Sequence, residues 1–194
     1  MLLEKEIIDY KENKDDILHW TTIKGEYRYS AIIEFLKSKG IECTWKNVTN
    51  YMRYDKRILV NSFKYIVLLE ELFKAFIYRH NQVKKRDLLR YGFSRALEEY
   101  IELGSQVSYD GIDVNYLRAN EATIEDFRNS VVHNKILLNR TFKGRLDLEK
   151  TLKVFCQALP DSYRAGFVKD INGCSLKLVE DAWNIIIPKK IAQF

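Results

Sequence analysis

The spacing of apolar residues predicts helices along almost the whole chain. Apolar positions recur three and four residues apart from about residue 45 to residue 80, which predicts one long helix, with a break near Tyr54 and Asp55 as the alternative. Shorter helices are predicted at 28–39, closed by Gly40, at 84–103, closed by Gly104, and at 147–159, ended by Pro160. We expect a loop at 105–118, around Asp110 and Gly111, and shorter helices up to the C-terminus.

Composition supports an all-α protein. Only two prolines and eight glycines punctuate 194 residues, which favours long helices over many short strands. A hydrophobic content of 46% is enough for one core, either in a single domain or in a domain with an appendage. No apolar run approaches the ~18 residues that span a bilayer, and the N-terminus has no basic stretch followed by an apolar one, so we expect no membrane partner and a cytoplasmic location.

The cysteines and histidines do not form a metal-binding pattern. The three cysteines are widely spaced with no C-x-x-C pair, so we expect reduced, mostly packed thiols. His19, His80 and His133 are too far apart in sequence to form a local metal cluster. We therefore expect no cofactor, and any hydrolytic chemistry should be independent of metal.

Arg128, Asn129 and His133 are the strongest candidates for catalysis. An imidazole is the side chain whose unperturbed pKa lies nearest neutrality, so it can take and give a proton at working pH. A guanidinium stays charged and offers a rigid fork of donors that matches two phosphate oxygens. A cation, an amide and an imidazole within one and a half helical turns therefore suggest phosphodiester chemistry.

We expect these three residues on one helix. Ile124, Phe127, Val131 and Leu138 recur at the spacing of one apolar face, and Thr123, with Asp126 three residues on, resembles a start signal. Asn129 and His133 are four apart and share a face, whereas Arg128 and His133 are about 140° apart. The alternative interpretation is structural: a solvated ion pair for the arginine and a packed, hydrogen-bonded histidine.

The pattern of Arg, a polar residue, three further residues and then His resembles the R-x(4–6)-H signature of HEPN-superfamily ribonucleases. Three stretches look like those of bacterial abortive-infection proteins of the AbiD/AbiF type, in the family's order: 35–41, 54–59 running on to 69–71, and 127–135 ending in 137–142. The sequence departs from related toxins at Lys135, which replaces the tyrosine that marks HEPN toxins modified by a nucleotidyltransferase antitoxin. Regulation by such a paired antitoxin is therefore not expected from this feature.

The resemblance implies a HEPN-like helical bundle at 57–194 preceded by an N-terminal helical region at 1–56, or one continuous domain. It implies a metal-independent endoribonuclease that cleaves RNA by attack of the 2′-hydroxyl, in an antiviral toxin or abortive-infection role. It also implies a homodimer with a composite active site, because HEPN enzymes face two motifs across a dimer, and an antitoxin or phage-derived regulator is a further possible partner. The alternative is a non-catalytic HEPN-like module that binds RNA, a nucleotide or a partner protein.

Glu70 is the main supporting candidate. It falls within the apolar stripe of the long predicted helix, where a carboxylate is costly unless it is paired. By resemblance it matches a glutamate of the abortive-infection proteins, and Arg128 would be a suitable partner, although a core ion pair without catalytic duty is equally consistent. Glu71, beside Lys64 and Lys74, is expected to be a solvated surface charge.

Basic and polar residues after His133 are candidates for RNA contact. The net charge of +5 indicates only a slight preference for polyanionic partners. The RNA-binding candidates are Lys135, Asn139, Arg140 and Lys143, with Asn134 as a supporting residue. A second basic group at 84–90 is better explained as an ordinary helix end.

A segment rich in aromatic and basic residues, from Tyr27 to Arg57, allows two interpretations. Its rings could stack RNA bases while its cations follow phosphates. Such residues are more often helix-packing aromatics with flanking surface charges, and we prefer that interpretation.

Overall fold

The protein is all-α, as predicted. The computed structural model describes residues 3–81, 84–104, 111–175, 178 and 183–188. Within these residues it contains nine α-helices and two short 3₁₀ helices, and an isolated bridge pairs Phe142 with Leu146.

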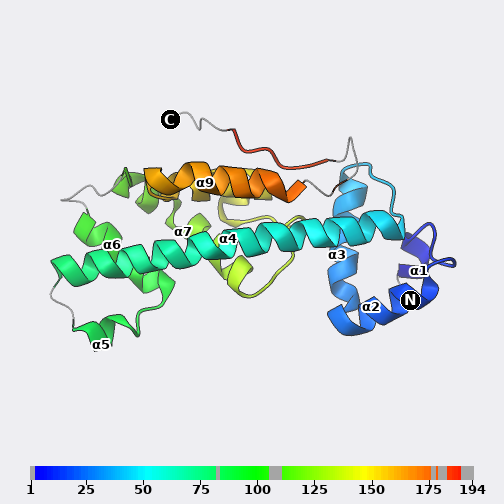
Figure 1. Ribbon diagram of the computed structural model, residues 1–194, viewed down its shortest axis with the longest axis horizontal. Coiled ribbons are helices and arrows are strands. Elements are labelled where there is room, and N and C mark those ends of the chain that lie inside the picture. The colour runs from blue at the N-terminus through cyan, green and yellow to red at the C-terminus, as the bar shows by residue number, and fades with distance from the viewer. Residues whose placement is uncertain (1–2, 82–83, 105–110, 176–177, 179–182, 189–194) are drawn as a thin grey trace.

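Helix α4 (Trp45–His80) is the spine of the molecule (Figure 1). Its 36 residues give a length of about 54 Å. It begins where the Thr44 side chain accepts a hydrogen bond from the backbone N–H of Asn47. The helix runs through Tyr54 and Asp55 without a break, so the continuous form of the prediction is confirmed.

Three helices lie at the N-terminal end of α4: α1 (Leu3–Glu6), α2 (Lys14–Lys24) and α3 (Glu26–Ser38). Gly25 joins α2 to α3 with a φ of 86°, a conformation that favours glycine. The predicted boundary between 1–56 and 57–194 falls inside α4. The two groups of helices therefore share one continuous helix, and the division into two regions stays a prediction.

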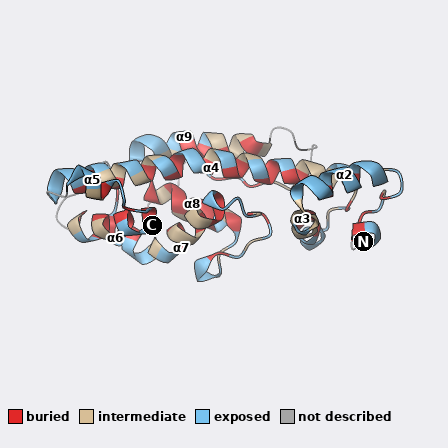
Figure 2. Cartoon of the chain, turned by 90° about the horizontal axis from the view of Figure 1, so that it is seen from below, coloured by how far each residue is buried: buried red, intermediate tan, exposed pale blue. Residues whose placement is uncertain are grey.

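Four of the remaining helices pack along the rest of α4: α5 (Lys85–Leu88), α6 (Phe93–Gly104), α7 (Val114–Val132) and α9 (Asp161–Asn172). Helix α8 (Leu148–Ala158) packs against α7 and α9. Buried residues gather where these helices face one another and α4 (Figure 2). Phe155 links two of these helices to its own, because its ring centroid lies 5.1 Å from that of Phe127 and 5.6 Å from that of Phe167. The result is one core that fixes α7 against α4.

Two predicted boundaries are wrong. The helix expected at 84–103 is split into α5 and α6 by residues 89–92. The loop expected at 105–118 ends early, because the Asp113 side chain accepts hydrogen bonds from two backbone N–H groups and starts α7 at Val114. Thr123 is therefore inside α7 and is not its start; residues 105–110 lie outside the described part of the chain.

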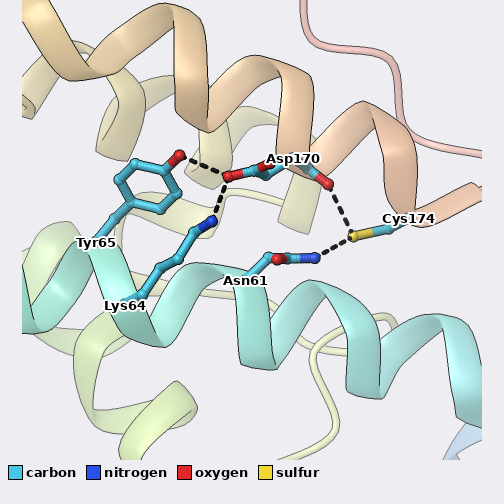
Figure 3. A network of polar contacts seen from close by, with 5 residues as sticks. All are labelled: Asn61, Lys64, Tyr65, Asp170 and Cys174. Carbon is cyan, nitrogen blue, oxygen red and sulfur yellow. Dashed lines mark hydrogen bonds and ion pairs between the residues drawn. The ribbon is translucent and has the colours of Figure 1, made fainter.

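A polar network joins α4 to α9 (Figure 3). The Tyr65 hydroxyl donates a hydrogen bond of 2.7 Å to Asp170, which also pairs with Lys64. Asn61 donates to the Cys174 sulfur at 3.2 Å. Burial would raise the pKa of Asp170, but the hydrogen bonds from Lys64 and Tyr65 outweigh it and lower the pKa.

The cysteines are packed thiols, as predicted. Cys43, Cys156 and Cys174 are all free and buried. Burial raises the pKa of Cys156 to about 12. No helix in the described ranges combines the length and the apolar character that crossing a membrane requires.

Candidate functional site

The three candidate catalytic residues lie at the C-terminal end of α7, which runs antiparallel to α4. This direction follows from two contacts, because Arg128 approaches Glu70 while Asn134, six residues later, approaches Lys56. The helix ends at Val132, and His133 is its C-cap residue, with φ −84° and ψ 11°. His133 is exposed, whereas Arg128 and Asn129 are half-buried. The expectation that all three belong to the helix is thus wrong by one residue.

Arg128 is held by α4 and by its own neighbour. Its Nη2 lies 3.8 Å from Oε2 of Glu70, as the sequence predicts, and its Nη1 donates to the Asn129 side-chain oxygen at 3.1 Å. The guanidinium carbon lies 5.7 Å from the centre of the Phe93 ring. Its Nε is buried without a hydrogen-bond partner among the described residues. The direction of the guanidinium is therefore fixed, with unused donor capacity.

Glu70 has a second cationic partner, a lysine that we expected to lie beside the neighbouring carboxylate. Lys74 donates to Oε1 of Glu70 at 2.7 Å, although we expected it beside Glu71. The reason is the spacing of four residues on one helix, which brings these side chains together. Two cations thus share one carboxylate, so the group as a whole keeps one positive charge.

His133 and Arg128 do not meet within one chain. Five residues on a helix correspond to about 7.5 Å along the axis and about 140° of rotation. The guanidinium is directed toward Glu70 on α4, while the imidazole is exposed at the helix end, and the described contacts include none between the two. The Asn129 side chain accepts from Arg128, and its backbone carbonyl accepts from the backbone N–H of His133 at 3.0 Å, which is the ordinary hydrogen bond of the last helical turn.

The segment after His133 is tied to α4 by a buried carboxylate that the sequence analysis missed. Oδ1 of Asp55 accepts hydrogen bonds from the backbone N–H groups of Leu137 and Leu138, at 2.7 and 2.9 Å. Burial raises the pKa of Asp55 to about 6, in spite of these two hydrogen bonds. The available signal was the same one that identified Glu70, a carboxylate on the buried face of a long helix.

Asn134 bridges three elements. Its φ of 52° lies in the left-handed region and turns the chain away from α7. Its carbonyl accepts from Nη1 of Arg28 at 2.7 Å, and its side-chain oxygen accepts from Nζ of Lys56 at 3.0 Å. The residue next to His133 is therefore attached to both α3 and α4.

The four RNA-binding candidates fall into two groups. Arg140 pairs with Asp126 at 2.7 Å, and the Asn139 amide donates to Glu34 at 2.7 Å, so these two side chains have structural partners. Lys135 and Lys143 are exposed. Of the four candidates, only Lys135 and Lys143 are cations that form no ion pair among the described residues.

The aromatic and basic segment near the N-terminus has features of both interpretations, because most of its rings are packed and most of its cations line a groove. Most of its rings are buried, which confirms packing for Tyr29, Trp45, Tyr51 and Tyr54. Four of its cations, however, line a groove of about 820 Å³ between α2, α3 and α4, together with Lys24 of α2 and with Asn134; the four are Arg28, Arg53, Lys56 and Arg57. The sequence could not show that these cations meet, because they come from three helices.

Among the described residues, no three His, Cys, Asp or Glu side chains are grouped as a metal site would require. Comparison with models of known protein families, with curated proteins and with solved structures finds no match.

Proposed function

We propose that the protein is a metal-independent endoribonuclease whose reacting groups are His133, Arg128 and Asn129. The observation that carries the proposal is the end of α7, where an exposed imidazole follows a guanidinium whose direction is fixed by Glu70 and by the Asn129 side chain. An exposed imidazole can reach a substrate, and a fixed guanidinium can stabilise charge on a phosphate. The resemblance to HEPN ribonucleases points to the same residues.

The reaction uses the substrate's own hydroxyl. His133 removes the proton of the 2′-hydroxyl, the O2′–P bond forms, and the P–O5′ bond breaks. An imidazolium returns a proton to the leaving O5′, so the products are a 2′,3′-cyclic phosphate and a 5′-hydroxyl. Arg128 stabilises the charge that builds on the phosphorane, and Asn129 orients His133 or the phosphate.

The mechanism calls for two imidazoles, and a homodimer supplies the second. Three apolar side chains lie exposed near the motif: Phe63 (46%) and Val67 (37%) on α4, and Val132 (39%) on α7. Phe63 and Val67 precede Glu70 by two turns and one turn, and Val132 follows Arg128 by one turn. Because α4 and α7 are antiparallel, all three lie at levels along the helix axes between the Glu70–Arg128 pair and the end of α7, and we propose that they form one apolar patch.

A second copy seated on this patch would bring a second His133 and Arg128 to the same place by two-fold symmetry. The apolar patch would be removed from water, and each Arg128 would approach a site that its own chain leaves incomplete. The reactive centre is accordingly composite, and the monomer is the inactive form.

The biological role that fits this chemistry is antiviral defence by abortive infection, in which RNA cleavage stops growth of an infected cell. Expression of the active protein should then be toxic, under control of an antitoxin or a phage-derived regulator.

A non-catalytic helical module that binds RNA, a nucleotide or a partner protein is the second candidate. One specific observation favours it: Arg128 already contacts Glu70 and Asn129 within its own chain, which is the arrangement of a structural ion pair. In that case the exposed His133 has no proton-transfer role.

Cleavage of RNA in the presence of a metal chelator separates the two candidates. His133→Ala is compared with the native protein, and His80→Ala is the matched control, since His80 is also exposed and lies at the other end of α4. The nuclease proposal predicts cleavage by the native protein and by His80→Ala, and loss of at least 100-fold for His133→Ala, as general acid and base catalysis requires. Intact RNA with all three proteins, or equal cleavage by all three, would reject it.

A further inference from the structure

We infer that the groove between α2, α3 and α4 binds a single strand of RNA and leads it to His133. The inference deepens the proposed function and rests on it for the identity of the strand, but binding can be measured without cleavage. The groove has a volume of about 820 Å³, and its basic walls carry Lys24, Arg28, Arg53, Lys56 and Arg57.

These five cations lack direct ion-pair partners among the described residues, although Arg28 and Lys56 lie near enough to Asp55 to lower the pKa of its carboxyl. Among the described residues, none of the five forms an ion pair with a carboxylate, whereas eight ion pairs occur elsewhere. Among the residues that the structure describes, none that lines the groove is acidic. The groove thus concentrates five positive charges, a number equal to the net charge of the whole protein, +5. Such a concentration attracts a polyanion and releases its counterions on binding.

Part of this positive surface is held in place before any ligand binds. Arg28 and Lys56 are fixed by their hydrogen bonds to Asn134, at 2.7 and 3.0 Å. Nε of Arg57 donates to the carbonyl of Cys174 at 2.7 Å, while its Nη2 is buried with no hydrogen-bond partner among the described residues. Arg53 is exposed and available to a phosphate.

Aromatic rings beside the cations favour a single strand. Tyr27 is 72% exposed and Trp20 is 39% exposed, and both line the groove. Exposed rings next to phosphate-binding cations are the arrangement on which unpaired bases stack. A duplex hides its base faces, and a membrane surface would require a protruding patch where this one is hollow. Nζ of Lys24, 4.7 Å from the centre of the Trp20 ring, adds a cation at the same point.

The corner between α2 and α3 is shaped around the exposed tyrosine. A Cβ built on Gly25 would lie 2.7 Å from Cε1 of Tyr27, so only glycine leaves room for the ring in this position. The ring is thereby placed at the mouth of the groove while α2 and α3 remain in contact.

Asn134 connects the groove to the candidate catalytic residue. It is part of the groove wall, and His133 is its neighbour in the chain, with Cα atoms about 3.8 Å apart. A strand that follows the cations of α3 and α4 therefore passes Asn134 and reaches the exposed imidazole. The groove positions the RNA, and the end of α7 acts on it.

Binding is tested with a fluorescent oligouridylate whose 2′-hydroxyls are methylated, so that it cannot be cleaved by attack of the 2′-oxygen. Fluorescence anisotropy is measured over a series of salt concentrations for the native protein and two double variants. Lys24→Ala with Arg53→Ala removes two groove cations, and Lys150→Ala with Lys169→Ala removes two exposed cations outside it. The two double variants have the same net charge.

We expect the groove variant to bind at least 10-fold more weakly, with a slope of log affinity against log salt reduced by about 1.4, or about 0.7 for each phosphate contact. The control variant should bind like the native protein. Tyr27→Ala should weaken binding about 5-fold or more and Tyr27→Phe should not, because stacking needs only the ring.

Equal binding by both double variants would overturn the inference and leave the nuclease proposal standing. Groove-dependent binding without cleavage of ordinary RNA would support the groove inference and overturn the nuclease proposal. Groove-dependent binding of duplex RNA or of phosphatidylserine vesicles as tightly as of the single strand would also overturn it, because the groove would then recognise negative charge alone.

Discussion

Replacement of Asp55 tests how the segment after the motif is held in place. The Asp55 carboxylate is 1% exposed, and its Oδ1 is the acceptor for the backbone N–H groups of both Leu137 and Leu138. Asp55→Asn keeps an acceptor oxygen there, whereas Asp55→Ala removes it. Both variants are uncharged, so the difference between them isolates the two hydrogen bonds.

The magnitude follows from the cost of leaving buried donors without partners. Each unsatisfied buried N–H costs about 1–3 kcal/mol, so Asp55→Ala should be less stable than Asp55→Asn by about 2–6 kcal/mol. This difference should not depend on pH, because neither replacement titrates.

The comparison of Asp55→Asn with the native protein should depend on pH. The folded-state pKa of Asp55 is raised from 3.8 to about 6, so the folded protein binds the proton more tightly than the unfolded chain does. Ionisation of Asp55 therefore lowers the free energy of unfolding as the pH rises from about 4 to about 6, by up to about 3 kcal/mol. The asparagine variant should gain stability relative to the native protein over this range and keep that gain above pH 7.

Urea unfolding of the three proteins at several pH values measures these differences. Equal stability of Asp55→Ala and Asp55→Asn would refute the role of the two hydrogen bonds. A difference between Asp55→Asn and the native protein that does not change between pH 4 and pH 7 would refute the raised pKa.

Three further predictions concern packing, electrostatics and assembly. The thiols of Cys43, Cys156 and Cys174 should react with a thiol reagent in absorbance assays only as fast as the protein unfolds, because all three are buried; rapid modification of the native state would contradict this. Asp170→Asn should lower the unfolding free energy at pH 7, because the lowered pKa of Asp170 stabilises the fold above about pH 4. The loss should disappear in acid, where the carboxylate of the native protein is protonated. Denaturation of both proteins across this pH range measures the loss, and a loss independent of pH would count against the prediction. Phe63→Glu should convert the proposed dimer to a folded monomer in sedimentation and abolish cleavage, whereas the surface control Lys150→Glu should do neither. An unchanged sedimentation coefficient for Phe63→Glu would show that Phe63 is not part of a dimer interface.

Local signals predicted the helices well where the chain itself carries the stop signal. Helix α3 closes before Gly40 and α8 ends before Pro160, since glycine and proline terminate helices through their own backbone properties. The start of α7 was misplaced because the Asp110–Gly111 pair suggested a longer loop, while the effective cap is Asp113.

The candidate site was predictable in one respect and not in another. A carboxylate inside an apolar stripe must find a cation, which is why Glu70 could be matched with Arg128. The partners of Asp55 are backbone N–H groups 82 and 83 residues away, and backbone groups carry no sequence signature. The groove likewise depends on the packing of α2 against α3 and of α3 against α4, so its five cations are separate local features until the fold brings them together.

The central claim is that an imidazole and a guanidinium cleave RNA through the substrate's own 2′-hydroxyl. The most direct measurement uses a DNA strand that carries one internal ribonucleotide, incubated with the native protein in chelator, with the product ends identified by mass spectrometry. The account predicts a single cut after the ribonucleotide, leaving a 2′,3′-cyclic phosphate and a 5′-hydroxyl, and no cut with His133→Ala. Cleavage at deoxynucleotides, products with 3′-hydroxyl and 5′-phosphate ends, or an intact strand together with intact RNA would contradict it.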